Sequence, residues 1–300
     1  MPPNQAETIP ETPLAFTKAS GDYDRKKALV PMASNYTNDN VTDHEMRDMA
    51  TMLTHLTQEE IACFPDDHMP LRHLRAEKGD TNKAVTKLKA ALQWRKEFGV
   101  DEIVQSCSGN PPNAMSPIIE KENETSKLYV RGYDKDGRAL LYMRPAKENT
   151  QDAVNNMRHL VWNLEKAIAC SAKNGRSKIC IIIDYDEFQL RHAPPMSTSR
   201  YTLDILQKHY PERMHKAYVC NPPFVFRTFW SLIRPFIDPT TKEKIVFCHG
   251  KKGLEQIAND VGSVHREKYL EKCAGGVDTL PSVISKEYLT LPFDMTYGEE

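Results

Sequence analysis

The sequence predicts an α/β fold, in which a mixed, mainly parallel sheet with flanking helices follows a small helical N-terminal subdomain. Two observations carry this prediction. Apolar residues recur at the helical period in the first part of the chain, whereas the second part alternates between strand and helix periods, as in βαβ units. With 300 residues, the chain has the length of one large domain with a helical appendage.

The N-terminal part divides into an arm and a helical subdomain. Residues 1–42 hold several prolines among Ser, Thr, Asn and charged residues, with no sustained periodicity, so we expect a disordered arm. From 43 to 103 the pattern is helical. Asp80 can cap a long helix in which Leu88 and Leu92 fall on one face. This stretch is the expected helical subdomain.

A turn-rich segment, residues 103–126, links this subdomain to a predicted hairpin. Residues 128–133 and 139–143 have the composition of strands. The turn between them, Asp134-Lys-Asp-Gly137, supplies the aspartate and the glycine that a tight turn needs.

Strands and helices then alternate to the end of the predicted α/β domain, which we place at residues 115–276, before a C-terminal extension at 277–300. A helical stripe runs from Val154 to Ile168, and Ile179–Ile183 is a β-branched run typical of a strand covered on both faces. The further expected elements are a helix at 197–210, a strand at 217–220, a helix at 224–236, a strand at 245–248 and a helix at 253–261.

Composition excludes several classes of function. Lys plus Arg (40) nearly balance Asp plus Glu (41), which leaves no overall field for binding nucleic acid. The 7 cysteines are scattered without close pairs, as expected of a reducing compartment. Neither a signal peptide nor an apolar run of about 20 residues is found. We therefore expect a cytoplasmic protein with, at most, peripheral membrane contact.

Motifs for catalysis, metal binding and nucleotide binding are missing from the sequence. It contains no GxGxxG, GxxxxGK, HExxH, CxxC or GxSxG pattern. An enzyme that uses Cys180 or Cys220 as nucleophile and His209 or His215 as base is a weaker alternative, because buried strand cysteines are usually inert. The sequence thus predicts no catalytic residue, no metal and no cofactor, and it favours binding over chemistry.

The most informative segment, residues 209–247, contains a helix with more bulky apolar side chains than one sheet face requires. Prolines bound this helix on both sides, which suits a segment that moves as a unit. Such a helix borders a cavity or enters a bilayer, or else it is an ordinary packed surface helix. Its large apolar residues are Phe224, Phe226, Phe229, Trp230, Ile233 and Phe236.

At this segment the sequence resembles the CRAL-TRIO family, in particular the fungal secretory-pathway phosphatidylinositol transfer proteins. The resemblance rests on Tyr210-Pro-Glu-Arg213, on Asn221-Pro222 and on the run from Pro235 to Ile245. It extends to the helical subdomain through Leu71-Arg-His-Leu-Arg-Ala76 and Gln93-Trp-Arg-Lys96, and to the hairpin turn. In all, it covers residues 50 to 276.

The resemblance implies a non-enzymatic lipid carrier with an apolar pocket, floored by the sheet and closed by a gate helix at residues 224–236. It implies one bound phospholipid as cargo and no cofactor. Contacts to the lipid headgroup are implied for Asp134, Glu212, Thr241, Lys244 and Arg72. The implied pocket and gate residues are Leu141, Leu164, Ile179, Ile181, Ile183, Val219, Phe224, Phe226, Phe229, Trp230, Ile233 and Phe236.

Two departures from the family pattern bear on the cargo. Glu77 stands where the family has an arginine associated with the phosphate, so Arg72, Arg75 or Lys78 has to compensate. The positions that hold tyrosines and hydroxyl residues in relatives that carry phosphatidylcholine match Leu141, Leu164, Ile179 and Ile181. Without those groups a buried choline lacks cation–π and hydrogen-bond partners, which makes phosphatidylcholine a poor candidate.

The resemblance therefore favours a phosphatidylinositol-transfer protein that acts as a monomer and touches intracellular membranes transiently. Two alternatives remain open. The same fold can bind a sterol, a tocopherol or a similar weakly polar ligand, because its pocket floor is aliphatic. It can also act as a lipid sensor that regulates a partner such as a lipid kinase or a small GTPase.

Overall fold

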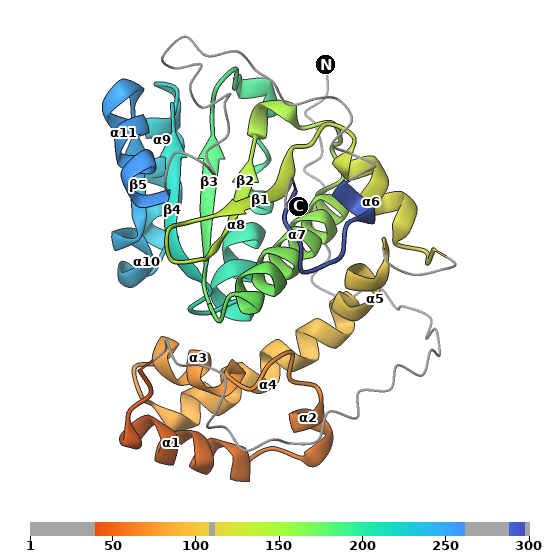
Figure 1. Cartoon of the computed structure of the whole chain (residues 1–300), viewed down its shortest axis with the longest axis vertical. Coiled ribbons are helices and arrows are strands. Elements are labelled where there is room, and N and C mark those ends of the chain that lie inside the picture. Colours follow the sequence, from red (N-terminus) through yellow and green to blue (C-terminus); the bar gives the residue numbers. More distant parts are fainter. Residues whose placement is uncertain (1–39, 108–111, 262–287, 298–300) are drawn as a thin grey trace, which may run out of the picture.

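The computed structural model describes residues 40–107, 112–261 and 288–297. Within them, four helices form a helical unit beside a larger domain built on one sheet, and Figure 1 shows the helical unit in orange below the sheet. This arrangement confirms the predicted α/β class. The predicted arm, apart from its last three residues, and residues 277–287 and 298–300 of the predicted extension lie outside the described residues.

The helical unit starts where its sequence supplies caps. Thr42 and Glu45 form a reciprocal capping box at the start of α1, and Asp80 accepts a hydrogen bond from the backbone N–H of Lys83 at the start of α4. Leu88 and Leu92, on the predicted apolar face, are buried in the core of this unit. Its helices are α1 (Asp43–Thr54), α2 (Gln58–Ala62), α3 (Met69–Ala76) and α4 (Thr81–Phe98).

The sheet has the strand order β1-β2-β3-β4-β5. The β1–β2 hairpin is antiparallel and all later neighbours are parallel. At the hairpin turn Gly137 has a φ of +89°, which explains the glycine there. The strands are β1 (Leu128–Tyr133), β2 (Ala139–Met143), β3 (Ile179–Asp184), β4 (Met214–Cys220) and β5 (Ile245–Cys248).

Helices flank the sheet on both faces. The long helix α7 packs along β1 and β2, whereas α9 and α11 lie at the β4–β5 side (Figure 1). The linker expected at 103–126 contains helix α6, because Pro117 is tolerated in a first helical turn and Ile119 is buried. The helices are α5 (Val100–Gln105), α6 (Ser116–Asn123), α7 (Ala153–Lys173), α8 (Met196–Asp204), α9 (Phe226–Ile233), α10 (Pro239–Glu243) and α11 (Gly250–Val261).

Alternate strand residues point to opposite faces of the sheet, and their contacts identify each face. On one face Val219 is in register with Phe247, whose ring centroid lies 5.2 Å from that of Trp230 on α9. On the other face the hydroxyl of Tyr218 donates to Asp260 on α11, at 2.9 Å. Helix α9 therefore covers one face of the sheet and α11 the other.

The described part of the C-terminal extension, residues 288–297, packs against the sheet domain. Val130 of the edge strand β1 donates its N–H to the hydroxyl of Tyr288 and accepts from the N–H of Tyr297. Lys166 of α7 is fully buried and donates to the carbonyl of Pro292 at 2.9 Å. These contacts cover the polar edge of β1, which would otherwise be open to pairing with another chain.

Candidate functional site

Charged residues gather where the parallel strands begin. Lys178 and Lys244 lie immediately before β3 and β5, and Glu212 lies two residues before β4; parallel strands start at the same edge of a sheet. The Nζ atoms of Lys178 and Lys244 both lie 3.3 Å from Oε2 of Glu212. Partial burial acts to raise the pKa of Glu212, but the two ammonium groups outweigh it and lower that pKa. The cluster carries one more cation than anion.

Of the implied headgroup residues, Glu212 and Lys244 are in direct contact, and Thr241 lies on the turn that leads to Lys244. Asp134 is at the same edge of the sheet but serves the hairpin. Its Oδ1 accepts from the N–H groups of Asp136 and Arg138, and its Oδ2 accepts from the Arg138 guanidinium. The turn thus uses both oxygens of Asp134.

Arg72 belongs to a neighbouring cluster. It donates to both oxygens of Asp66, at 2.7 and 2.8 Å, and Asp66 also accepts from Arg213. Glu212 has a left-handed backbone conformation (φ 56°). Its side chain pairs with the two lysines, whereas the next residue, Arg213, pairs with Asp66 of the helical unit. Arg72 is therefore joined to the lysine cluster through Asp66 and the loop that contains Glu212 and Arg213.

Except for Leu164, which lies on helix α7, the aliphatic residues implied as a pocket floor share one face of the sheet. Leu141 is in register with Ile181, and Ile183 with Val219. Because Val219 is in turn in register with Phe247, this is the face that α9 covers. Leu141, Leu164, Ile179, Ile181 and Val219 are buried, and Ile183 is half-buried.

Helix α9 rests on this face through aromatic contacts. It spans Phe226–Ile233 and continues as a 3-10 turn through Phe236, so the segment expected as one helix from 224 to 236 has an irregular start and end. Phe226 and Ile233 are buried, and the Phe226 ring lies 4.8 Å from Tyr185 and 6.1 Å from Phe247. Phe229 and Trp230 are half-buried. The floor and the gate segment, residues 224–236, thus face each other.

Residues 123–276, which include the sheet, the floor and the gate segment, match the family model described as the CRAL/TRIO domain. The chain belongs to the CRAL/TRIO domain family. The predicted resemblance is thereby confirmed.

Relatives of this CRAL/TRIO chain include fungal proteins. It is 38% identical over 209 residues to a CRAL-TRIO domain-containing protein of Schizosaccharomyces pombe, a match that covers 67% of this chain and 19% of that one. It is 34% identical over 182 residues to the phosphatidylinositol transfer protein PDR17 of Saccharomyces cerevisiae, covering 59% of this chain and 51% of the relative. These matches therefore span only part of both relatives.

A solved structure has the same fold. The crystal structure of Sfh5 superimposes with a TM-score of 0.57 at 18% identity, covering 83% of this chain and 96% of that one. Within the described ranges of this CRAL/TRIO chain, none of the helices combines the length and the hydrophobicity needed to cross a bilayer.

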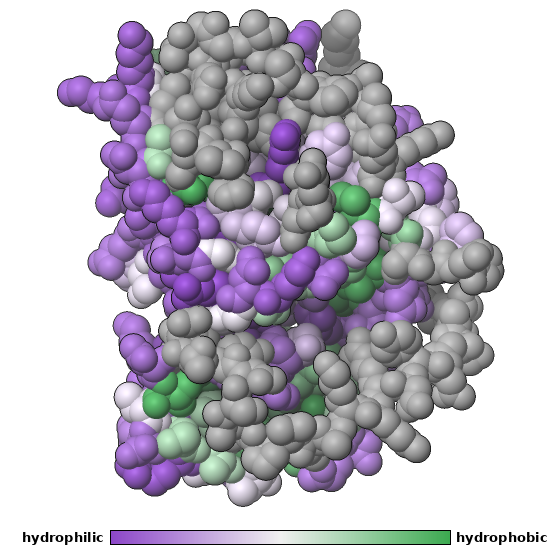
Figure 2. Space-filling model, in the orientation of Figure 1, coloured by the Kyte–Doolittle hydropathy of each residue, from purple (hydrophilic) through white to green (hydrophobic). Residues whose placement is uncertain are grey.

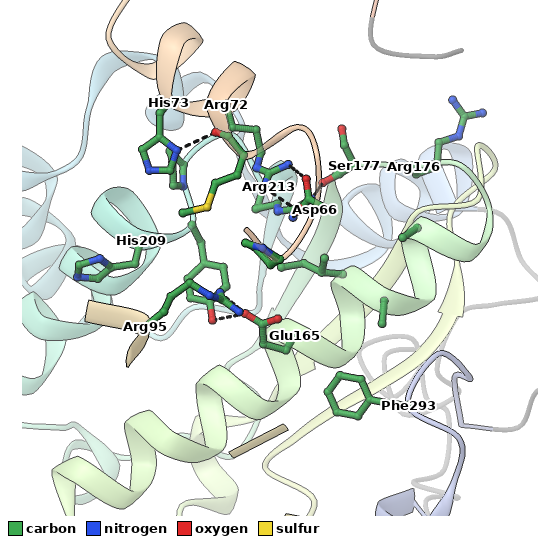
Figure 3. A pocket seen from close by; sticks show the side chains of 17 residues that line it. Asp66, Arg72, His73, Arg95, Glu165, Arg176, Ser177, His209, Arg213 and Phe293 are labelled. Atoms are coloured by element: carbon green, nitrogen blue, oxygen red, sulfur yellow. Dashed lines mark hydrogen bonds and ion pairs between the residues drawn. The ribbon is translucent and has the colours of Figure 1, made fainter. Parts of the chain in front are cut away.

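A cavity of about 190 Å³, whose lining includes several charged side chains, lies where the helical unit meets the CRAL/TRIO domain. In Figure 2 a notch separates the two parts, with the helical unit at the bottom. Figure 3 shows Arg72 and Arg213 both directed at Asp66, and Arg95 directed at Glu165. Arg95 lies 2.6 Å from Glu165, which also accepts from the hydroxyl of Tyr210 at 2.7 Å.

Burial determines the electrostatics of this cavity. It lowers the pKa of His73 to about 4, and also that of His209, which stacks on Trp94 at 4.0 Å. It would raise the pKa of Asp66, but the guanidinium groups of Arg72 and Arg213 hold that pKa well below its usual range. Two pairs of opposite charge therefore hold the two parts of the chain together.

Sequence reasoning missed most of the residues of this cavity. Asp66 and Glu165 belong to no motif, and Arg95 was noted only as part of Gln93-Trp-Arg-Lys96; the three come from the loop before α3, from α7 and from α4, respectively. The available signals were the three runs Leu71-Arg-His-Leu-Arg-Ala76, Gln93-Trp-Arg-Lys96 and Tyr210-Pro-Glu-Arg213, which supplied the resemblance but no partners for their charged residues.

Proposed function

We propose that this CRAL/TRIO chain binds one phospholipid between the floor residues and the gate segment and transfers it between membranes without covalent chemistry. The observation that carries the proposal is the face-to-face arrangement of an aliphatic floor and an aromatic helix that lies over it. Acyl chains gain roughly 0.8 kcal/mol for each methylene removed from water, so a carrier needs such a covered apolar surface.

Phosphatidylinositol is the proposed cargo. The cluster of Lys178, Glu212 and Lys244 pairs a surplus cation, which suits a phosphate, with a carboxylate that can accept from inositol hydroxyl groups. Thr241 adds a hydroxyl beside Lys244. We do not assign Arg72 to the phosphate, because two nitrogens of its guanidinium already donate to Asp66. We therefore assign the phosphate to the two lysines.

Phosphatidylcholine is the disfavoured cargo. Leu141, Leu164, Ile179 and Ile181 are buried and aliphatic, so they offer a quaternary ammonium neither an aromatic face nor a hydroxyl. PDR17, one of the relatives, is named as a phosphatidylinositol transfer protein, which agrees with this choice.

A weakly polar ligand such as a sterol or a tocopherol is the second candidate. Two observations favour it. The floor residues are aliphatic, and Arg72, on α3, already forms an ion pair with Asp66. A ligand with a single hydroxyl needs no phosphate site. In either case we place the chain in the cytoplasm as a monomer that visits membrane surfaces and presents its lipid to a partner such as a lipid kinase.

Identification of the bound lipid tests the function. The protein is purified without detergent, its organic extract is analysed by mass spectrometry, and transfer of labelled phosphatidylinositol and phosphatidylcholine between vesicles is measured in parallel. We expect phosphatidylinositol in the extract and its transfer at a rate severalfold above that of phosphatidylcholine. A sterol or tocopherol in the extract, with no phosphatidylinositol transfer, supports the second candidate. Equal transfer of both phospholipids contradicts the cargo assignment.

A further inference from the structure

Two buried imidazoles line the cavity between the helical unit and the CRAL/TRIO domain. His73 is only 2% exposed, and within the described ranges its Nε2 atom has no hydrogen-bond partner. The same is true of Nδ1 of His209. Figure 3 shows both imidazoles on the side of the cavity away from Phe293. Because buried polar atoms nearly always have a hydrogen-bond partner, this side of the cavity indicates a place for a ligand.

The protonation of His73 follows from its other ring nitrogen. Nδ1 lies 2.9 Å from the carbonyl oxygen of Met69, and a carbonyl can only accept, so the proton of the neutral ring is on Nδ1. Nε2 therefore carries a lone pair and can accept but not donate. A second proton on Nε2 turns the ring into a cation that donates from both nitrogens. An anion can pair with Nε2 only if it brings this proton with it.

The charged side chains of the lining favour an anion. Four guanidinium groups line the cavity, against two carboxylates, those of Asp66 and Glu165. Arg72 and Arg213 share Asp66, whereas Arg95 donates to Glu165 through one terminal nitrogen. A guanidinium has five N–H donors, so Arg95 retains donors for a ligand. The lining thus carries more positive than negative charge.

The same charges keep the imidazoles neutral at pH 7. Burial is the main cause that lowers the pKa of His73 to about 4; Arg72 and Arg213 lower it further, and Asp66 opposes them. Burial lowers the pKa of His209 to about 4 as well. A negative charge beside the rings would raise both pKa values, so anion binding takes up a proton. The other charged groups around His209 are Lys208, Asp204 and Arg95.

Part of the cavity wall is apolar. It consists of Ile168, Ala169 and Ala172 on α7 and of Phe293 in the C-terminal segment. The volume of about 190 Å³ somewhat exceeds that of a cavity of roughly 150 Å³ that takes up benzene. It is smaller than the range of about 300–1,000 Å³ that drug-sized ligands occupy. A compact apolar body with one acidic group fits both the size and the lining.

We propose that this cavity binds a small organic acid, whose anionic group lies beside His73 and Arg95 and whose apolar body packs against α7 and Phe293. Binding of the anion takes up one proton. The site is separate from the proposed lipid site, because no floor or gate residue belongs to its described lining. Its occupant contacts both the helical unit and the CRAL/TRIO domain, and it reaches Arg213, the residue next to Glu212 of the lysine cluster.

Calorimetric titration of the full chain tests the proposal. Benzoate is the probe, because it joins a benzene ring to one carboxylate, and benzyl alcohol is its neutral counterpart of similar size. Both are titrated at about pH 8 and about pH 6 at constant ionic strength. The test variants are His73→Gln, which removes the second protonation, and Ala169→Leu, which fills the cavity and leaves every charge in place. Their matched controls are His55→Gln and Ala90→Leu, at exposed positions of the helical unit.

We expect benzoate to bind at least tenfold more tightly than benzyl alcohol at the lower pH. Benzoate should also bind at least tenfold more tightly at the lower pH than at the higher one, since uptake of one proton changes affinity by up to tenfold per pH unit. His73→Gln should lose most of this pH dependence. Ala169→Leu should weaken benzoate binding at least tenfold, and both control variants should bind as the wild type does.

Three outcomes overturn the proposal. Without saturable benzoate binding, the cavity holds only water. Equal affinities of the wild type for benzoate and benzyl alcohol, or equal benzoate affinities at the two pH values, exclude a proton-linked anion site. Unchanged benzoate binding in a folded Ala169→Leu variant places the probe elsewhere on the chain. The first two outcomes need no variant, so the proposal stays falsifiable if a substitution prevents folding.

The inference does not rest on the proposed function, and the two are tested by different measurements. The lipid extracted from the purified wild type and its transfer between vesicles test the function. Benzoate binding and its pH dependence test the cavity. A chain that transfers lipid but does not bind benzoate keeps the function and loses the acid site, whereas the reverse result keeps only the acid site.

Discussion

Asp66 and Arg213 form an ion pair across the boundary between the helical unit and the sheet domain, although 147 positions separate them in the sequence. Arg72 donates to the same carboxylate, and the side chains of both arginines are only 8% exposed. The pair fixes the loop that carries Glu212. It thus ties the fold of the helical unit to the geometry of the proposed headgroup site.

Removing this carboxylate should destabilise the whole chain. We expect Asp66→Asn to lower the free energy of unfolding by about 2–4 kcal/mol, because two largely buried guanidinium groups lose their common counter-charge. Urea unfolding monitored by circular dichroism measures the change. Glu124→Gln, which breaks the exposed pair with Lys121, is the control and should change stability by less than about 0.5 kcal/mol. A similarly small effect of Asp66→Asn would show that the pair is not structural.

Stability should fall as the pH drops from 7 to 5. Burial lowers the pKa of both His73 and His209 to about 4 from a usual 6.5, so the folded state favours the neutral imidazoles. The contribution of these neutral imidazoles to the free energy of unfolding is complete above pH 6.5. It is lost as the pH falls towards 4, because the imidazoles of the unfolded chain bind protons at a higher pH than those of the folded chain. We expect a loss of roughly 1–2 kcal/mol per imidazole by pH 5.

Urea unfolding at several pH values measures this loss. His73→Gln should flatten the pH dependence, whereas the exposed His55→Gln should leave it unchanged. An unaltered slope in His73→Gln would contradict the assignment of the pH dependence to the cavity.

The lysine cluster should decide phosphatidylinositol transfer. Lys244→Ala is expected to slow transfer severalfold with a stability change of less than about 0.5 kcal/mol, because Lys178 remains to pair with Glu212. Lys242→Ala, which removes the same charge from the same turn, is the matched control. Fluorescent lipid transfer between vesicles measures both variants. Normal transfer by Lys244→Ala would place the headgroup elsewhere.

Tyrosines at Leu141 and Leu164 should allow the chain to bind the choline group of phosphatidylcholine. Leu141→Tyr combined with Leu164→Tyr is expected to raise phosphatidylcholine transfer, since each ring can face a quaternary ammonium. The added bulk costs about 1–3 kcal/mol, because both positions are buried. Phosphatidylcholine transfer and lipid analysis of the purified variant measure the gain. The matched Leu141→Phe, Leu164→Phe variant separates the hydroxyl groups from the rings. A folded tyrosine variant that still excludes phosphatidylcholine refutes the choline argument.

The gate segment should lose protection during exchange. Hydrogen exchange in α9 is expected to speed up when vesicles are added, while β3 stays protected, because the segment has prolines at its ends and few buried residues. Trp230→Asp should suppress transfer, since the Trp230 ring packs on Phe247 in the closed form. Uniform protection of α9 and β3 while transfer proceeds would falsify the gate assignment.

Local pattern was enough to predict much of the fold. The capped helix from Thr81, the turn at Asp134 to Gly137 and the β-branched strand from Ile179 depend on neighbouring residues, whose spacing a sequence displays. The sequence pattern predicted irregular elements less well. The helix expected at 197–210 ends as a π-helical turn from Ile205 to His209, and α6 lies in a segment that turn residues marked as a linker.

Residue type and local period were enough to predict the α/β class and an aromatic helix between prolines, whereas the floor and gate assignments came from the resemblance and stay predictions. Which charged side chains meet depends on tertiary packing. It joined Glu212 to two lysines that precede other strands, and it buried Lys166 against a C-terminal segment that returns to β1. Such pairs depend on how distant segments pack, and no local period records a partner that lies between 32 and 158 positions away.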